Sequence, residues 1–200
     1  MIDYGYGISL GHVISPFALE WRNCPEVFAT CRQFTLLSDK SHQQWLDRIA
    51  TDPSCKMFSI HSEEYHNIPV GVGGLTNICW QARHAEVSLY IAPSYQGKKL
   101  SFKALATICR HGFEDFNLNK LWGEIFNNNI KSIKIFTRLG FVPSPGHIQH
   151  YFREGKYIDT TFVSLLAQDW FSTQEMLRSK QDQSSEVPNG TRAETNGTNQ

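Results

Sequence analysis

The chain has 200 residues, 40% of them hydrophobic, and its 19 Lys and Arg residues balance its 19 Asp and Glu residues. This is enough for one domain with a buried core, and the neutral balance argues against a protein that binds nucleic acid mainly through phosphate contacts. Five scattered cysteines without CxxC spacing, no basic-apolar leader and no apolar run of membrane length predict a reduced, cytoplasmic protein (host cytoplasm if the chain is viral).

Apolar periodicity and turn residues divide the first half of the chain into a strand, two helices and three strands. In chain order these elements are expected at Tyr6–Ile14, Phe17–Cys31, Ser41–Ala50, Lys56–His61, Pro69–Asn77 and His84–Ala92. Pro25 interrupts the first helix, and Ser41 is expected to cap the second. The last strand alternates, which places Val87 on an apolar face and Glu86 on a polar face.

The second half is predicted to alternate helix, strand and helix before two final strands. These elements are expected at Lys98–Phe116, Lys120–Phe126, Ile130–Leu139, His147–Arg153 and Tyr157–Gln168. Gly140 ends the second of these helices, and an EGK turn joins the last two strands. Residues 1–171 are expected to form the domain. A short helix over 172–183, opened by a capping box of Ser172 and Glu175, and a disordered polar tail over 184–200 follow it.

One strand-to-helix junction, APSYQGKKLSFKAL (Ala92–Leu105), suggests a place to hold phosphate. Unpaired amides and the positive end of the helix dipole favour an anion at such a helix start. The junction has only one glycine, however, where phosphate loops usually carry two or three. The alternative is an ordinary helix start whose lysines are solvated.

The order of elements over about Tyr6–Trp170 resembles the GNAT superfamily of acyl-CoA-dependent N-acetyltransferases. Three stretches carry the resemblance: the junction with its preceding strand, NIKSIKIFTRLGF, and LEWRNCPEV, which is similar to the branch of ribosomal-protein and nucleotide-sugar acetyltransferases. The resemblance implies an α/β (α+β) fold, with a central mixed, mostly antiparallel sheet of about seven strands flanked by helices. It also implies acetyl-CoA as co-substrate and no metal.

In this family the loop after the fourth strand reads Gln/Arg-x-x-Gly-x-Gly/Ala and binds the CoA pyrophosphate. Gln96 matches, whereas Lys99 and Ser101 replace the two small residues; Lys99 is the larger departure, because Gly there allows close approach or a positive φ. The implied CoA-binding residues are Leu89, Tyr90, Ile91, Gln96, Gly97, Lys98, Lys99, Leu100, Ser101, Asn129, Ser132 and Phe136.

Transfer of an acetyl group to an amine needs a base for the amine proton and a donor for the developing oxyanion. Glu86 is the leading base candidate and Glu124 the reserve, with His84 weaker; an amide near Leu89–Ile91 would be the oxyanion donor. Phe136 stands where many family members have the tyrosine that protonates the thiolate. Ser132, Tyr151 or water are the remaining donors. The alternative to a catalytic role for Glu86 is an ordinary exposed or ion-paired strand residue. The alternative to CoA binding for Asn129 is a helix cap.

The acceptor is left open by the sequence. Trp21, Arg22 and Asn23 match the family's acceptor-side helix, with core packing and a structural ion pair as the alternative. A protein N-terminus or small-molecule amine, an amino-sugar nucleotide, and an aminomethylated nucleobase of phage DNA all fit, and so does a catalytically silent binding module. A homodimer is common for the fold. His147 and His150 are predicted to point to opposite faces of a strand, which argues against a shared metal site.

Overall fold

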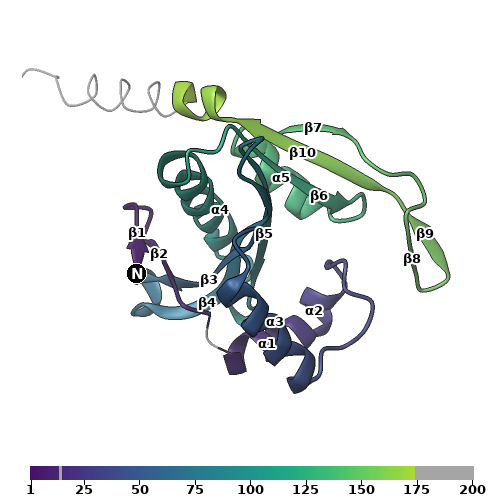
Figure 1. The fold of residues 1–200 in the computed structure, drawn as a ribbon. Helices are drawn as coiled ribbons and strands as arrows, with labels where there is room; N and C mark the ends of the chain where they lie inside the picture. Colours follow the sequence, from purple (N-terminus) through teal and green to yellow (C-terminus); the bar gives the residue numbers. More distant parts are fainter. Residues whose placement is uncertain (14, 174–200) are drawn as a thin grey trace, which may run out of the picture.

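The computed structural model describes residues 1–13 and 15–173, which form one large sheet and a small separate hairpin (Figure 1). The large sheet has eight strands in the order β1-β2-β3-β4-β5-β6-β10-β7, and all its neighbours are antiparallel except β5 and β6. Its strands are β1 (Ile2–Asp3), β2 (Ile8–Gly11), β3 (Lys56–Ser62), β4 (Ile68–Cys79), β5 (His84–Ile91), β6 (Lys120–Phe126), β7 (Val142–Pro145) and β10 (Thr160–Leu166). Strands β8 (Tyr151–Arg153) and β9 (Lys156–Ile158) make the hairpin, which projects from the body (Figure 1). The mixed, mostly antiparallel sheet that the sequence predicted is confirmed.

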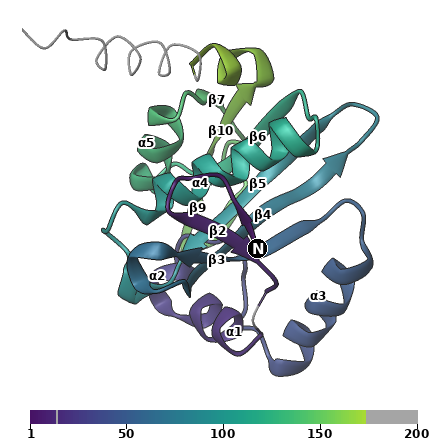
Figure 2. The ribbon, with the colours of Figure 1, turned by 90° about the vertical axis from the view of Figure 1, so that its left-hand side faces the viewer.

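The helices lie on both sides of β5. They are α1 (Ser15–Asn23), α2 (Pro25–Phe28), α3 (Asp39–Thr51), α4 (Leu100–Arg110) and α5 (Ile130–Arg138), with short turns at Glu63–Tyr65, Pro93–Tyr95 and His111–Asp115. The apolar face of β5 joins α4 in the core, where Val87 and Ile91 share a cluster with Leu100 and Ala104. Helices α1 to α3 gather together at one end of the molecule (Figures 1 and 2). The hydroxyl of Tyr90, on the other face of β5, reaches α1.

Two helix starts differ from the prediction for identifiable reasons. Helix α3 begins after Ser38, whose side chain accepts from the Ser41 amide while the Ser41 hydroxyl accepts from the Ser38 amide, so Ser41 completes a capping box and is not the cap itself. Helix α4 begins at Leu100 and not at Lys98, because Gly97 and Lys99 have left-handed φ angles of 79° and 61°. A helix cannot continue through such residues.

The region after α5 was predicted least well. Strand β7 was missed because it contains two prolines; as an edge strand it tolerates them. The predicted strand Tyr157–Gln168 breaks at Asp159 into β9 and β10. The predicted strand His147–Arg153 is strand only from Tyr151, and residues 146–150 are a loop. The argument that placed His147 and His150 on opposite faces was therefore wrong: their rings lie 4.5 Å apart.

The end of the described chain is helical over residues 167–173. Ser172 lies inside this helix and donates to the Gln168 carbonyl, so it does not open a separate helix. Glu175, the rest of the predicted 172–183 helix and the predicted tail lie outside the described residues. No described helix has the length and hydropathy needed to cross a bilayer, and all five cysteines are unpaired.

Candidate functional site

Strands β5 and β6 pair over only three positions and then separate. Their parallel register joins His84 to Lys120, Ala85 to Leu121 and Glu86 to Trp122. Beyond Glu86, β5 continues to Ile91 with β4 alone as its partner, and β6 continues with β10. In the described chain, one backbone edge of β5 over 87–91 therefore pairs with no strand. The predicted residues Leu89, Tyr90 and Ile91 lie on this stretch, whose free amides and carbonyls suit an extended amide-containing ligand.

The loop that follows β5 presents backbone amides at the start of α4. The Gln96 side-chain amide donates to the Ile91 carbonyl at 3.1 Å and so ties the loop to the end of the strand. Within the described residues, the amides of Gly97, Lys98 and Lys99 donate to no other group, and no side chain caps α4. Lys99 adopts the left-handed conformation that the family's glycine allows. Lys99 thus takes a positive φ without glycine at this position, and the amides and helix dipole favour an anion here.

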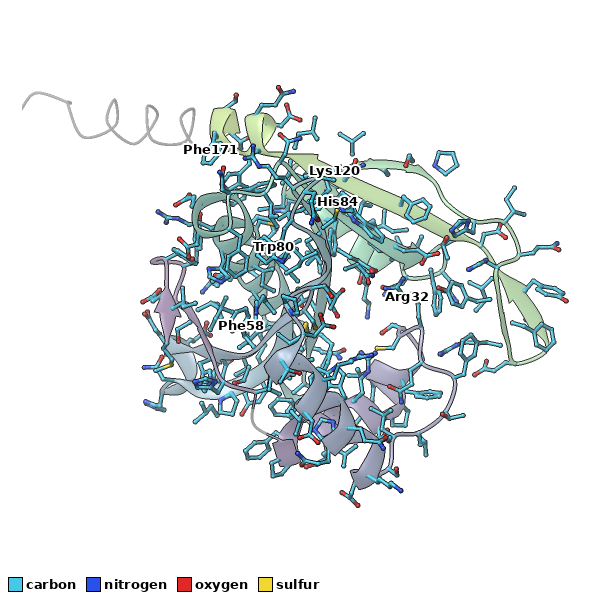
Figure 3. The ribbon with its side chains drawn as sticks, viewed as in Figure 1. Arg32, Phe58, Trp80, His84, Lys120 and Phe171 are labelled. Carbon is cyan, nitrogen blue, oxygen red and sulfur yellow. The ribbon has the colours of Figure 1, made fainter. Side chains whose placement is uncertain are left out.

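Two carboxylates meet where the strands separate. Glu86 occupies the last paired position of β5, opposite Trp122 of β6. Glu124 follows Trp122 by two residues on β6. Side chains two apart on a strand share a face, so both carboxylates point to the same side of the sheet. Arg32, from the loop after α2, binds Glu86 through Nη2 and Glu124 through Nη1, the latter at 2.7 Å. Figure 3 shows Arg32 reaching toward the sheet from that loop.

Each carboxylate has neutral partners as well. Asn77 donates to Glu86 Oε2 at 2.7 Å, and the Glu86 side chain is only 3% exposed. Glu124 accepts from the hydroxyls of Thr160 (3.0 Å) and Tyr151 (3.2 Å). Burial raises the pKa of the Glu124 carboxyl, but the hydrogen bonds from Arg32 and Thr160 outweigh burial and hold that pKa below its ordinary value. Glu124 is therefore ionised at neutral pH.

The Trp21-Arg22-Asn23 segment holds the loop that carries Arg32. Arg22 donates to Gln33 Oε1 and to Cys31 Sγ, each at 2.9 Å, and its guanidinium lies over the Tyr90 ring. Asn23 bonds both the amide and the carbonyl of Leu37 at 2.8 Å. Trp21 stacks on Phe17. Arg22 and Asn23 thus hold the loop that carries Arg32 and do not themselves contact the carboxylate pair, while Trp21 contacts Phe17 of its own helix.

The other predicted residues lie away from the pair. Asn129 Oδ1 accepts from the Ser132 amide and caps α5, the alternative role considered for it. Phe136 is buried against Phe141, at a ring distance of 4.9 Å, and has no proton to donate. His84 lies with Lys120 at the far end of the short parallel ladder (Figure 3).

Arg32, Asn77 and Thr160 were not predicted. Arg32 directly follows the helix predicted to end at Cys31, in a segment with no helix or strand periodicity. Asn77 reaches Glu86 at the point where the β4 register shifts, between Thr76 and Cys79. Thr160 was assigned to a strand that in fact begins there. Tyr151 was considered only as a proton donor. The alternation of β6 is the one signal that could have placed Glu124 beside Glu86, given the strand pairing.

Comparison with known proteins found a family model and several relatives that match this chain. Residues 14–142 match the family model described as an acetyltransferase (GNAT) domain. Spermidine N(1)-acetyltransferase of Escherichia coli K12 is 34% identical over 87 residues, 44% of this chain and 47% of that protein. Acetyltransferase PseH of Campylobacter jejuni is 26% identical over 125 residues, 61% of this chain and 73% of that protein. The chain thus spans about half the length of the E. coli relative.

Solved structures show the same fold. The Vibrio cholerae spermidine N-acetyltransferase in complex with CoA and spermine superposes with a TM-score of 0.77 at 19% identity. The superposition covers 82% of this chain and 98% of the Vibrio chain. At this identity the likeness concerns the arrangement of helices and strands.

Proposed function

The chain belongs to the GNAT acetyltransferase family, and from that membership we propose that it transfers an acetyl group from acetyl-CoA to a primary amine. The observation that carries the proposal is the unpaired edge of β5 leading into the amide-rich loop before α4. The edge suits the two amide groups of a pantetheine arm, and the loop suits a pyrophosphate. Both features come from consecutive residues of one strand and one loop.

The reaction forms a bond between the amine nitrogen and the thioester carbonyl carbon. The carbon–sulfur bond then breaks, the nitrogen loses a proton and the departing thiolate gains one. An amide on the free edge of β5, at Leu89 to Ile91, would donate to the carbonyl oxygen as negative charge develops on it. With Phe136 in the usual tyrosine position, the thiolate would take its proton from water, from Ser132 or from Tyr151.

Glu86 is the proposed base. It is the last residue of β5 that pairs with β6, so it lies at the start of the free edge on which the thioester would sit. In the structure described here Glu86 binds Arg32. A positive amine that replaced this guanidinium could give its proton to Glu86 directly or through one water.

The carboxylate pair favours a cationic acceptor. Both carboxylates are nearly buried, at 3% and 7% side-chain exposure, and together they already hold one organic cation. A polyamine offers the same charge on a thinner chain, and proteins named for spermidine acetylation are among the relatives. A small polyamine is therefore the first acceptor to test, followed by a peptide N-terminus, an amino-sugar nucleotide and an aminomethylated nucleobase.

The test combines calorimetric binding of CoA with a thiol-release assay across these acceptors. We expect CoA to bind in the micromolar range and one amine to release thiol at a rate that Glu86→Gln lowers at least tenfold. Asp47→Asn, a charge-neutralising change on the exposed face of α3, is the matched control and should leave turnover unchanged. Absence of CoA binding would refute the proposal. CoA binding without turnover on any amine would instead identify a silent binding module. Lys99 and Phe136 motivate that alternative, because both depart from the family's residues at functional positions.

A further inference from the structure

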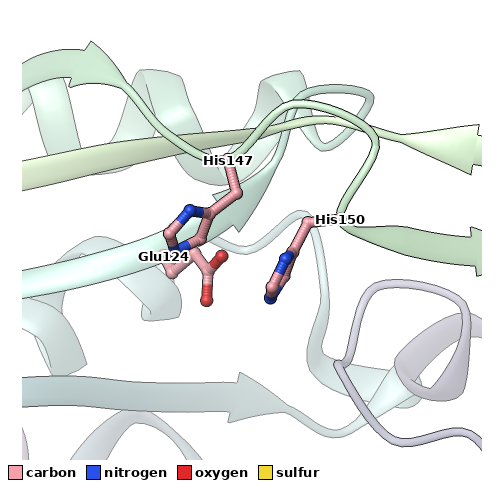
Figure 4. Close-up of side chains that lie close together, drawn as sticks. All are labelled: Glu124, His147 and His150. Atoms are coloured by element: carbon pink, nitrogen blue, oxygen red, sulfur yellow. The ribbon is translucent and has the colours of Figure 1, made fainter.

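Three side chains with metal-binding atoms meet beside β6. They are Glu124 of that strand and His147 and His150 of the loop between β7 and β8 (Figure 4). One ligand atom from each lies within 4.8 Å of the others. Both histidines are exposed, whereas the Glu124 side chain is only 7% exposed, so an ion could reach the group past the two histidines.

The backbone around His147 is fixed by hydrogen bonds to the start of β10. The His147 amide donates to the Thr160 hydroxyl at 2.9 Å, and the Thr160 amide donates to the His147 carbonyl at 2.9 Å. The same Thr160 hydroxyl donates to Glu124 Oε1. Thr160 therefore holds the histidine loop and the carboxylate at one position, as residues around metal ligands commonly do.

The rings are oriented by their neighbours. His147 packs edge-on against Phe162 at 5.2 Å, and His150 against Tyr151 at 4.9 Å. Within the described residues neither imidazole makes a hydrogen bond, so both keep a nitrogen lone pair free for a metal. The two ring centroids lie 4.5 Å apart with 31° between the ring planes. Because the nitrogen lone pairs lie in those planes, rotation of the exposed side chains is what turns both nitrogens toward one ion.

We propose that Glu124, His147 and His150 bind one divalent transition-metal ion of the zinc type. Two imidazole nitrogens and one carboxylate oxygen are a donor set for zinc, cobalt or nickel, whereas magnesium and calcium prefer oxygen ligands alone. In tetrahedral zinc sites the ligand atoms lie about 3.3 Å apart. The present spacing closes to that value by rotation of the two exposed histidine side chains, and water completes the coordination.

Arg32 competes with the ion for the carboxylate. Its guanidinium binds Glu124 Oε2, which also accepts from Tyr151, while Oε1 accepts from Thr160. A carboxylate has about four lone-pair sites, so one remains for a metal. The positive charge of Arg32 nevertheless opposes a second cation at this distance. Removing Arg32 should therefore strengthen metal binding, an effect that a site elsewhere on the chain would not show.

The experiment is a calorimetric titration of the untagged full chain with zinc. The buffer is set about one pH unit above the ordinary imidazole pKa of about 6.5, because a neutral imidazole is the form that binds a metal. We expect one ion per chain. His147→Ala and His150→Ala should each lower the affinity at least tenfold, and Arg32→Ala should raise it. His12→Ala, which removes an exposed histidine outside the group, should change nothing. Both loop histidines are exposed, so circular dichroism should show that these variants stay folded.

Cobalt distinguishes the proposed ligands from the thiols of this chain. Cobalt held by nitrogen and oxygen gives weak visible bands, whereas a bound cysteine adds an intense thiolate-to-metal charge-transfer band. We expect only the weak bands, and their loss in His147→Ala with His150→Ala. A thiolate band, or zinc affinity that is unchanged in this double variant, would overturn the assignment. The measurement does not depend on turnover, so it stands apart from the proposed acetyl transfer.

Discussion

Replacing Arg32 by Ala should leave two nearly buried carboxylates without their shared cation. Removing one partner of a fully buried ion pair costs about 3–5 kcal/mol, and an exposed pair contributes about 0–1 kcal/mol. Arg32 lies between these limits, because its side chain is 38% exposed while those of Glu86 and Glu124 are 3% and 7% exposed. The neutral donors Asn77 and Thr160 remain in place. We therefore expect Arg32→Ala to lower the free energy of unfolding by about 2–3 kcal/mol at neutral pH.

The assay is urea unfolding followed by tryptophan fluorescence, with thermal melting as a second probe. For a chain of this size the loss corresponds to a melting temperature lower by about 4–12 °C. Arg32→Lys should recover only part of it, because one ammonium cannot bind two carboxylates as the planar guanidinium does. Arg48→Ala, which removes an exposed arginine of α3, should cost less than about 0.5 kcal/mol.

The origin of the loss can be checked by pairing substitutions. With Glu86→Gln already in place, Arg32→Ala should cost at least about 1 kcal/mol less than it does alone, because one buried charge is gone. If Arg32→Ala costs no more than Arg48→Ala, or if the cost is the same with Glu86→Gln, then Arg32 does not neutralise the pair and the electrostatic argument fails.

Three further predictions concern β4, α5 and the pH dependence of stability. Gly71→Ala should lower the free energy of unfolding in urea by about 1–3 kcal/mol, because the new Cβ would overlap the Tyr90 carbonyl. The control is Gly123→Ala, whose Cβ would meet only ordinary contacts from 3.4 Å outward. It should lower that free energy by less than half as much. Asn129→Ala should cost about 1 kcal/mol by melting, through loss of the α5 cap, and an unchanged melting temperature would contradict that role. The lowered pKa of Glu124 gives stability that is complete above its ordinary value of 4.5 and is lost as pH falls through the folded-state pKa. Acid titration of Glu124→Gln should therefore show a shallower loss of stability below that pH than the unchanged chain, and parallel curves would contradict the assignment.

The sequence was sufficient for most elements that periodicity and capping determine. The strands at 56–62, 84–91 and 120–126 and the helix at 130–138 were placed within one or two residues, because their apolar alternation and end signals agree. The failures lie where tertiary contacts override local preference. β7 is a strand despite two prolines, since β10 pairs with it, and residues 146–150 are held as a loop by Thr160 and Asp159.

The candidate site could be predicted strand by strand but not as a group. Glu86 and Glu124 were each named from their own strand. The strand–helix–strand order favours β5 and β6 as parallel neighbours, but it does not give the register that brings the two carboxylates together. Arg32 carries no sequence signal, because a single arginine in a loop is usually solvated. Its position follows from the bonds that Arg22 and Asn23 make to the loop around it. Arg22 and Asn23, which were first considered for acceptor binding, thus hold the loop that positions Arg32.

The charged group and the interrupted sheet have one common cause. Up to Glu86, the last paired position, β5 and β6 satisfy each other's backbone. Once the strands separate, the β5 edge is left without a strand partner, and an ion pair that spans the opening keeps the adjacent carboxylates compensated. The site therefore has two requirements: backbone partners for the β5 edge, and a cation for Glu86 and Glu124. A thioester would meet the first and a cationic amine the second. Binding of a thioester and a cationic amine should consequently be cooperative, with the amine binding more tightly when the CoA analogue is present than when it is absent.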